Sequence, residues 1–443
     1  MRHKRVSAGT FREHLPPSSH AEVVKRTFPE EKSVSSISSA LIVGGGIAGL
    51  ATAVALQRAG IRSTVYEASA RGDLEVGACF TIAVNGLDAL DAVGALQPVI
   101  GPGHPTNWMG FRNAGGQSLG RVPNGIPRAD GITTSTFRRA DLYRGLAEEA
   151  ERRGIAFEFG KRLAGYEERE SGVVARFTDG STATADVLIA ADGLRSRIRS
   201  QLDPTAPTPR YSGLLGFGGF APNPGLEPEP DGAWTFAFGR RAFVGWFVPE
   251  REPDQVWWFV NVPSEQPLTA RQVQEVGMER WCDRLVDLFR DDRLPVEAMV
   301  RAQGPETLIG IGAQYDLPAI PTWHRGRVVL VGDAAHAVST SSGQGASIAL
   351  ESAVTLARCL RDGSSPEAAF AAYEALRRDR VRRVWELGKR GASSKAAGPL
   401  GRFRRDLLLR AGLRFVKPAG AAWLLQHHIE FEAPVTEGLT AAA

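Results

Sequence analysis

Three glycines stand at a spacing that lets a backbone approach a phosphate closely. Gly44, Gly46 and Gly49 form a G-x-G-x-x-G turn inside a predicted strand–helix–strand unit over 40–67. Glycine permits the sharp strand-to-helix bend, and the N–H groups at the start of the helix attract a pyrophosphate. The second strand ends in Glu67, whose carboxylate can accept hydrogen bonds from ribose hydroxyls and would repel a 2′-phosphate. The unit predicts dinucleotide binding, and both NAD and FAD fit it.

Further segments decide between these two cofactors. They are Arg139-Ala-Asp-Leu142, Ala191-Asp192-Gly193-Leu-Arg-Ser196-Arg-Ile-Arg199, and Val331-Gly332-Asp333-Ala-Ala-His336 followed by Gly343-Gln344-Gly345-Ala346. They resemble the R-x-x-L, D-G-x-x-S-x-x-R and GDAAH…GQGA signatures of the class A flavoprotein monooxygenases, the para-hydroxybenzoate hydroxylase-like family. Together with the glycine turn, four motifs follow one another in the order of that family.

The resemblance implies a non-covalently bound FAD and gives roles to the matching positions. Asp333 would bond the ribityl chain, and Arg139 would lie near the pyrophosphate or the ribityl chain. Asp192 and Gly193 resemble the segment that serves both FAD and the nicotinamide cofactor. The backbone of 344–346 would face the flavin N1–C2=O edge, where a helix N-terminus favours the anionic reduced flavin. The predicted cofactor-binding residues are Gly44, Gly46, Gly49, Glu67, Arg139, Asp192, Gly193, Gly332, Asp333, Gly343, Gln344, Gly345 and Ala346.

Three other side chains near these motifs have two interpretations each. His336 is a weak candidate for catalysis, since a histidine just past a buried strand more often satisfies local backbone groups. Relatives often carry prolines where this chain has Ala337 and Thr340, and the Thr340 hydroxyl is a second weak candidate. Cys79 lies in a region near the flavin in relatives, where covalent attachment competes with the simpler role of a small buried residue. The catalytic chemistry itself is expected to belong to the flavin.

The chain predicts an α/β fold with a Rossmann-type FAD-binding domain, a second, antiparallel-sheet substrate domain and C-terminal helices. Strands are expected over 173–177, 182–191 and 327–331, the last two as buried runs. Aromatic strands over 234–262 form either one wall of an apolar pocket over the flavin or the core of their sheet. The predicted organisation is a disordered basic extension (1–37), a discontinuous FAD-binding domain (38–108, 134–205 and 300–385), a substrate domain (109–133 and 206–299) and a C-terminal helical tail (386–443).

Composition limits the classes of function. With 43% hydrophobic and 23% charged residues, the chain resembles a soluble globular protein. Cys79, Cys282 and Cys359 are too far apart for a disulfide framework or a metal cluster, which favours the cytoplasm and predicts no metal site. The charge-free run 39–56 imitates a membrane span, but its four glycines belong to the dinucleotide turn.

Positive charge is concentrated at the two ends of the chain. Residues 38–388 carry 37 basic and 41 acidic residues, which argues against a nucleic-acid groove. Residues 389–417 carry nine basic residues against one acidic residue, and apolar residues recur every four positions from Phe403 to Phe415. This pattern predicts an amphipathic basic helix that docks on the acidic body or, alternatively, contacts an anionic membrane or partner.

These observations predict an FAD-dependent monooxygenase that uses NADH or NADPH and O₂. The resemblance implies transfer of oxygen from a flavin C4a-hydroperoxide, which would hydroxylate or epoxidise an apolar aromatic or polyketide-like small molecule. Such a substrate is typical of secondary metabolism and antibiotic biosynthesis. The alternative is an FAD-dependent reductase or dehydrogenase of the same fold. A flavin halogenase is a distant third, because 33–160 contains no lysine and the halogenase W-x-W-x-I-P motif is missing. The sequence leaves the oligomeric state open.

Overall fold

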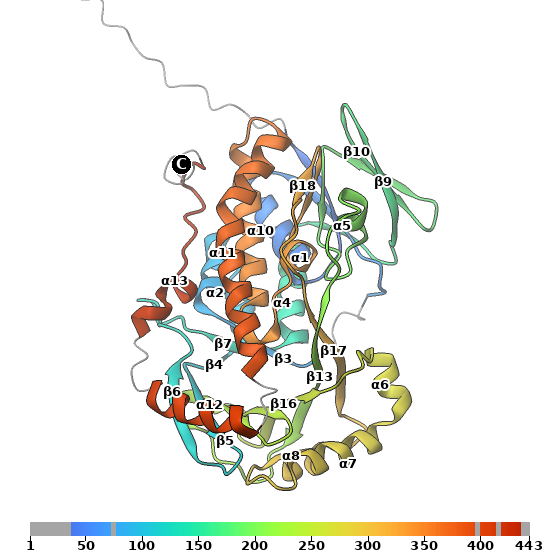
Figure 1. Cartoon of the computed structure of the whole chain (residues 1–443). Helices are drawn as coiled ribbons and strands as arrows, with labels where there is room; N and C mark the ends of the chain where they lie inside the picture. Colours follow the sequence, from blue (N-terminus) through green and yellow to red (C-terminus); the bar gives the residue numbers. More distant parts are fainter. Residues whose placement is uncertain (1–36, 72–76, 395–398, 413–417, 436–443) are drawn as a thin grey trace, which may run out of the picture. The chain divides into compact units, whose positions relative to one another are not determined.

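The computed structural model describes residues 37–71, 77–394, 399–412 and 418–435 (Figure 1). The predicted disordered extension over 1–37 lies outside these residues, except for the buried Ile37. No helix in the described ranges is both long enough and apolar enough to span a membrane.

A six-stranded sheet forms the base of the predicted cofactor domain. In spatial order its strands are β18 (His324–Arg325), β19 (Val328–Leu330), β12 (Val187–Ala190), β1 (Ser39–Val43), β2 (Arg62–Tyr66) and β8 (Ala156–Glu158). Neighbouring strands are parallel except for the β18–β19 pair. Apart from the half-buried Ser39, its central strands β1, β12 and β19 are buried, as expected of a parallel sheet covered on both faces. The predicted strand–helix–strand unit is confirmed.

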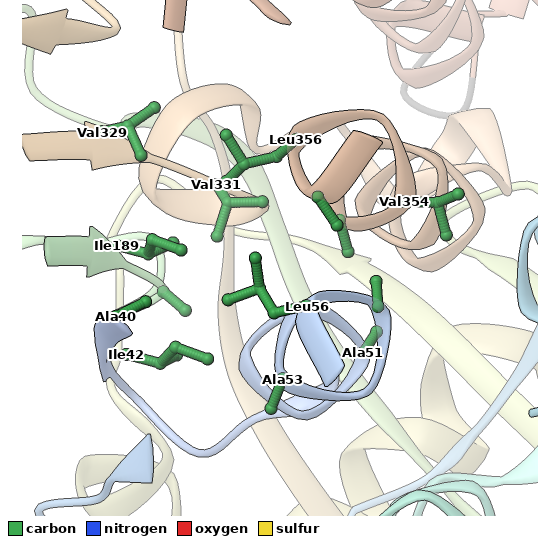
Figure 2. Packing of buried hydrophobic residues seen from close by; sticks show 14 of the residues in the cluster. Ala40, Ile42, Ala51, Ala53, Leu56, Ile189, Val329, Val331, Val354 and Leu356 are labelled. Atoms are coloured by element: carbon green, nitrogen blue, oxygen red, sulfur yellow. The ribbon is translucent and has the colours of Figure 1, made fainter. Parts of the chain in front are cut away.

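Helices complete this core around the sheet. They are α1 (Ile47–Arg58), α2 (Val84–Ala92), α3 (Gln97–Ile100), α4 (Arg139–Arg152), α10 (Gly345–Asp362) and α11 (Pro366–Ser394). Figure 2 shows Leu56 of α1 and Leu356 of α10 in one cluster with Ile189 of β12, Val329 of β19 and Val331, which directly follows β19. The alanine-rich buried face of α1 lets α10 approach closely, so the two helices that begin at the glycine motifs lie side by side.

The strand predicted over 182–191 is wrong as a single element. β11 (Thr182–Ala185) pairs with β10 (Gly172–Phe177) and β9 (Leu163–Arg169) in a separate antiparallel sheet, and β12 alone joins the parallel sheet. The break falls at Asp186, whose Oδ2 accepts hydrogen bonds from the backbone N–H groups of Ser38 and Ser39 at 2.8 and 2.9 Å. This carboxylate ties the bend to the start of β1.

A seven-stranded sheet carries the aromatic strands. In spatial order it contains β17 (Ile309–Asp316), β13 (Arg210–Pro222), β16 (Gln255–Pro263), β15 (Phe243–Phe247), β14 (Trp234–Phe238), β5 (Trp108–Asn113) and β6 (Ser118–Pro123). All neighbours are antiparallel except β14 and β5. The predicted substrate domain ended at 299. β17 lies beyond this boundary, yet it pairs antiparallel with β13 and so joins the aromatic sheet. The division of the chain into cofactor and substrate domains remains a proposal.

The seven-stranded sheet has two different faces, because side chains alternate along each strand. Val256, Trp258 and Val260 pack beneath α6 (Ala270–Val276), α7 (Met278–Phe289) and α8 (Val296–Gln303). Trp257 and Phe259 point to the other face, with Trp234, Phe236 and Phe247 from neighbouring strands. The aromatic strands therefore supply a core on one face and leave a second aromatic layer on the other.

A small three-stranded sheet joins the two larger ones. It contains β3 (Cys79–Ile82), β7 (Ser135–Arg138) and β4 (His104–Pro105). Trp234 of the aromatic sheet donates a hydrogen bond through Nε1 to Thr136 Oγ1 of β7 at 2.9 Å. β7 leads directly into α4, so this contact fixes the aromatic sheet beside the start of α4.

Part of the predicted helical tail is present as α12 (Pro399–Gly412), which lies beside β6 (Figure 1). Its Leu409 packs against the aromatic cluster around Phe238, and the Arg405 guanidinium lies 4.1 Å from the centre of the Phe238 ring. Docking on the body is therefore observed for this helix. Leu407 and Leu408 remain 59% and 67% exposed. A short helix, α13 (Ala422–Leu425), follows and contacts α2.

Candidate active site

The three motif glycines divide into two that shape the turn and one that opens to a cavity. A Cβ at Gly44, where φ is +107°, would collide with the carbonyl oxygen of Ala191, and a Cβ at Gly49 would collide with that of Gly44. At Gly46 a Cβ would meet nothing within 4 Å, and this residue lines the cavity. The first two glycines are therefore required by packing, and Gly46 leaves room for a ligand at the start of α1.

Two acidic residues hold backbone turns beside the cavity. Glu67 Oε2 accepts a hydrogen bond from Gly45 N at 2.7 Å, and Oε1 accepts one from Ser69 N at 2.8 Å. Glu67 thus fixes the glycine turn from the end of β2, and its ribose contact stays a prediction. Asp192 Oδ2 accepts from Arg197 N at 2.9 Å at the start of α5 (Arg197–Leu202). Asp192 Oδ1 is buried without a hydrogen-bond partner in the described residues, and burial raises the pKa of this carboxyl group.

A second turn follows β19 and places a carboxyl group opposite a guanidinium. Gly332 has φ +60°, and a Cβ there would lie 2.6 Å from Ala48 Cβ, so only glycine fits against α1. Asp333 begins α9 (Asp333–His336) and lines the cavity together with Arg139, the first residue of α4. Burial raises the pKa of Asp333 and the charge of Arg139 opposes this shift, while burial lowers the pKa of Arg139. The pair therefore places a hydrogen-bond donor, Arg139, and an acceptor, the Asp333 carboxylate, in the lining of one cavity.

The GQGA segment forms the N-terminus of α10 on the same cavity. Gly343 has φ +63°, in the left-handed region, and Gln344 precedes the first helical residue without a side-chain cap. Gln344 Oε1 accepts a hydrogen bond from the buried Asn85 Nδ2 at 3.1 Å. Gln344 N donates to Ser342 Oγ at 3.2 Å. Since the first N–H groups of a helix have no intrahelical acceptor, those of Gly345 and Ala346 can serve as donors to a ligand.

These segments surround one cavity of about 630 Å³. Of the predicted cofactor-binding residues, those lining it are Gly46, Arg139, Gly193, Asp333, Gly343, Gln344, Gly345 and Ala346. Gly44, Gly49, Glu67, Asp192 and Gly332 lie in the turns that support these residues rather than in the lining. Trp234, Phe236 and Phe259 of the aromatic sheet form the opposite wall. The cavity therefore extends from the glycine motifs to the second aromatic layer, which contains Trp234, Phe236 and Phe259.

The weak catalytic candidates lie in different places. His336 does not line the cavity; its Nε2 is 2.9 Å from Ser352 Oγ, and burial lowers its pKa to about 3. This is the environment of a neutral structural histidine. Thr340 lines the cavity and donates a hydrogen bond to Gln314 Oε1 at 2.7 Å. Cys79 also lines it, but burial raises the pKa of its thiol to about 12, which disfavours the thiolate that covalent attachment would need.

Sequence reasoning missed a polar group on the aromatic wall. Gln314 of β17 donates through Nε2 to Asn261 Oδ1 of β16 at 2.6 Å, and both residues line the cavity with Thr340. Asn261 shares a strand face with Trp257 and Phe259, because it follows them at intervals of two residues. A carboxamide at the next position of this aromatic strand face was the signal by which the sequence could have indicated a polar group on the wall. Its partner Gln314 comes from a strand 53 residues away in sequence.

The residues present fit an FAD molecule. Two helices, α1 and α10, begin at this cavity without acidic residues or side-chain caps in their first turns, and such N-termini favour a pyrophosphate and an electron-rich ring edge. Gly46 leaves space for the pyrophosphate, and Asp333 can accept hydrogen bonds from ribityl hydroxyls. The aromatic layer then lies opposite the edge marked by 344–346.

Comparisons with known proteins agree with this fit. The model of the FAD binding domain family matches residues 38–387. The FAD-dependent urate hydroxylase of Klebsiella pneumoniae is 32% identical over 348 residues, which cover 77% of this chain and 86% of that protein. The 6-hydroxynicotinate 3-monooxygenase of Pseudomonas fluorescens is 30% identical over 78% of this chain and 89% of its own length.

A solved structure extends the likeness to three dimensions. A variant of HpxO from Klebsiella pneumoniae, complexed with FAD, superposes with a TM-score of 0.76 at 28% identity and covers 88% of this chain and 98% of that one. The relatives named above are hydroxylases or monooxygenases, and none of these findings favours the reductase or the halogenase. The chain belongs to the class A FAD-dependent monooxygenases.

Proposed function

We propose that this enzyme uses NADH or NADPH to hydroxylate or epoxidise an apolar aromatic or polyketide-like molecule. The observation that carries the proposal is the continuity of the cavity, which joins the FAD motifs to the aromatic wall of Trp234, Phe236 and Phe259. A substrate of this kind would place the enzyme in secondary metabolism, including antibiotic biosynthesis. We propose a cytoplasmic location, because the three cysteines are all free thiols.

The aromatic wall is suited to orient a planar ring. The rings of Trp234 and Phe236 stack at 5.9 Å and 16°, and Phe259 lies within 6.0 Å of both ring centres. Aromatic pairs in such geometry contribute about 0.5–1.5 kcal/mol beyond the area they bury. The hydrogen bond from Trp234 to Thr136 fixes the orientation of this indole. The wall therefore holds a ring in one plane and keeps water away from it.

The side chains around the cavity bind and orient rather than perform acid–base chemistry. Arg139 and Asp333 are the charged residues that line the described cavity, and both belong to the FAD motifs. Bound FAD supplies the electron transfer and oxygen activation that these side chains lack. The N-terminus of α10 stabilises negative charge at the edge of the cavity that 344–346 forms.

The test is oxidation of NADH and NADPH by the FAD-loaded enzyme over a panel of phenols, indoles, quinolines, polyketides and terpenes. A substrate should accelerate the oxidation, consume O₂ and yield an oxygenated product with less than an equal amount of hydrogen peroxide. Reduction of a substrate without O₂ consumption would instead establish the reductase.

A further inference from the structure

We infer that the substrate is electrically neutral and carries an oxygen acceptor, a hydroxyl or a carbonyl group, which the Asn261 carboxamide binds. The inference rests on the proposed function and narrows it to a chemical class. It follows from the polar group on the aromatic wall and from the distribution of charge around the cavity.

The polar group is a chain of three side chains from three separate segments. Thr340 Oγ1 donates to Gln314 Oε1 at 2.7 Å, and Gln314 Nε2 donates to Asn261 Oδ1 at 2.6 Å. These bonds orient both carboxamides. Asn261 Nδ2 is left without an acceptor in the described part of the chain, and Asn261 lines the cavity. Nδ2 is open to the cavity rather than enclosed by protein atoms, so it can donate a hydrogen bond to an oxygen acceptor of the ligand.

A glycine in the neighbouring strand makes room for this arrangement. Gly216 of β13 pairs directly with Asn261 of β16, and a Cβ at Gly216 would lie 2.8 Å from Gln314 Nε2. The backbone of Gly216 does not have a positive φ, so the requirement for glycine here comes from the space that the Gln314 carboxamide occupies. Any larger residue would move Gln314 and with it the hydrogen bond that orients Asn261.

Among the residues that the structure describes, no cation lines the half of the cavity that the aromatic sheet forms. Arg139 is the cation in the described lining, and it lies with Asp333 among the FAD motifs. Two arginines outside the cavity lining are already paired: Arg138, which lies over the Trp257 ring, with Glu252 at 2.7 Å, and Arg210 with Asp316 at 2.6 Å. A substrate carboxylate would lose its hydration here without a cation to replace it. This differs from what the name of the relative 6-hydroxynicotinate 3-monooxygenase implies, since that substrate carries a carboxylate.

Matched pairs of probes test the inference on the FAD-loaded enzyme. The pairs are salicylate with salicylamide, and 6-hydroxynicotinate with 6-hydroxynicotinamide, which differ only in the exchange of a carboxylate for a carboxamide. Binding is followed by the change in the visible flavin spectrum. We expect the neutral member to bind at least tenfold more tightly in each pair. Equal or tighter binding of the carboxylate, or binding of neither member, overturns the inference.

Variants connect the preference to Asn261. Asn261→Leu should weaken binding of the carboxamides about tenfold, the equivalent of one hydrogen bond, with unchanged flavin content. Gly216→Ala acts from the neighbouring strand β13 by displacing Gln314, and it should also weaken binding of the carboxamides. Gln201→Leu, at an exposed amide outside the cavity, is the matched control and should leave binding unchanged. If Asn261→Leu and Gly216→Ala both bind the carboxamides as the wild type does, Asn261 does not hold the substrate.

Failure of this inference is distinguishable from failure of the proposed function. A carboxylate that binds tightly, accelerates NAD(P)H oxidation and gains an oxygen atom would refute the neutral substrate and retain the monooxygenase. Probes that bind without any oxygenated product, over the whole substrate panel, would instead count against the proposed function.

Discussion

Replacing Glu351 with glutamine would test how the C-terminal helices secure the flavin end of the cavity. Glu351 of α10 is fully buried and pairs with Arg377 and Arg380 of α11, each at 2.6 Å. It also accepts a hydrogen bond from Asn85 Nδ2 at 2.6 Å, and Asn85 in turn donates to Gln344 at 3.1 Å. The buried network therefore runs from α11 to the turn that opens on the cavity.

The pKa of Glu351 sets the expected magnitude. Complete burial raises this pKa, but the charges of Arg377 and Arg380 outweigh burial and hold it at about 2, below the ordinary value of 4.5. Such a depression corresponds to roughly 3 kcal/mol of folding stability. Leaving Arg377 buried without an ionised partner costs about 3–5 kcal/mol in comparable proteins. We therefore expect Glu351→Gln to lower the free energy of unfolding by about 3 kcal/mol near neutral pH.

The dependence on pH follows from the sign of this shift. Because the folded-state pKa lies below the ordinary one, the contribution of Glu351 is complete above pH 4.5 and is lost as the pH falls toward 2. The difference between the wild type and Glu351→Gln should therefore narrow below about pH 4.5. Urea unfolding of the FAD-loaded proteins, followed by circular dichroism, measures this difference at each pH.

Glu374→Gln is the matched control. Glu374 pairs with Arg378 within one turn of α11 at 2.5 Å, but both side chains are partly exposed. Its loss should cost less than about 1 kcal/mol. A Glu351→Gln protein within about 1 kcal/mol of the wild type, or a control that loses as much, would refute the reasoning.

Four further predictions concern three single positions and one adjacent pair. Gly46→Val should fold normally, since a Cβ there meets nothing, but should bind less FAD; full absorbance at 450 nm per chain would refute the pyrophosphate assignment. Thr340→Val removes the bond to Gln314 and should raise the peroxide formed per NAD(P)H oxidised while leaving flavin content unchanged. Burial depresses the pKa of His336 to about 3 from 6.5, so below pH 6.5 the unfolded chain binds a proton here that the folded protein does not. The free energy of unfolding should therefore fall by about 2 kcal/mol from pH 7 to pH 5, and His336→Gln should abolish this fall in urea titrations. If the exposed Leu407 and Leu408 contact membranes, replacing both with serine should reduce co-sedimentation with anionic vesicles, and equal co-sedimentation would leave docking on the body as their helix's role.

The cofactor side of the site could be predicted from the sequence because its signals are local. A turn such as 44–49 requires glycines at fixed spacing, whatever the rest of the chain does. The GDAAH and GQGA segments likewise carry their geometry within a few residues, and eight of the thirteen predicted cofactor-binding residues line the cavity. The other five support the turns instead. A sequence motif marks both groups alike, because it does not show whether a residue contacts the cofactor or holds the backbone that does.

The substrate side was less predictable because it depends on pairing between distant strands. Asn261 and Gln314 meet only because β16 and β17 both pair with β13. The apolar run over 182–191 shows the same limit, since the contact of Asp186 with Ser38 and Ser39 that divides it comes from a segment 147 residues away. Hydrophobic periodicity locates such strands but does not indicate which sheet each one joins.

Isotopic labelling tests the central claim most directly. The FAD-loaded enzyme is supplied with NAD(P)H, ¹⁸O₂ and the substrate that best accelerates NAD(P)H oxidation, and the product is analysed by mass spectrometry. We predict one ¹⁸O atom in each product molecule, with one NAD(P)H oxidised for each oxygen atom inserted. A product that contains no ¹⁸O, formed without O₂ consumption, would contradict the assignment as a monooxygenase.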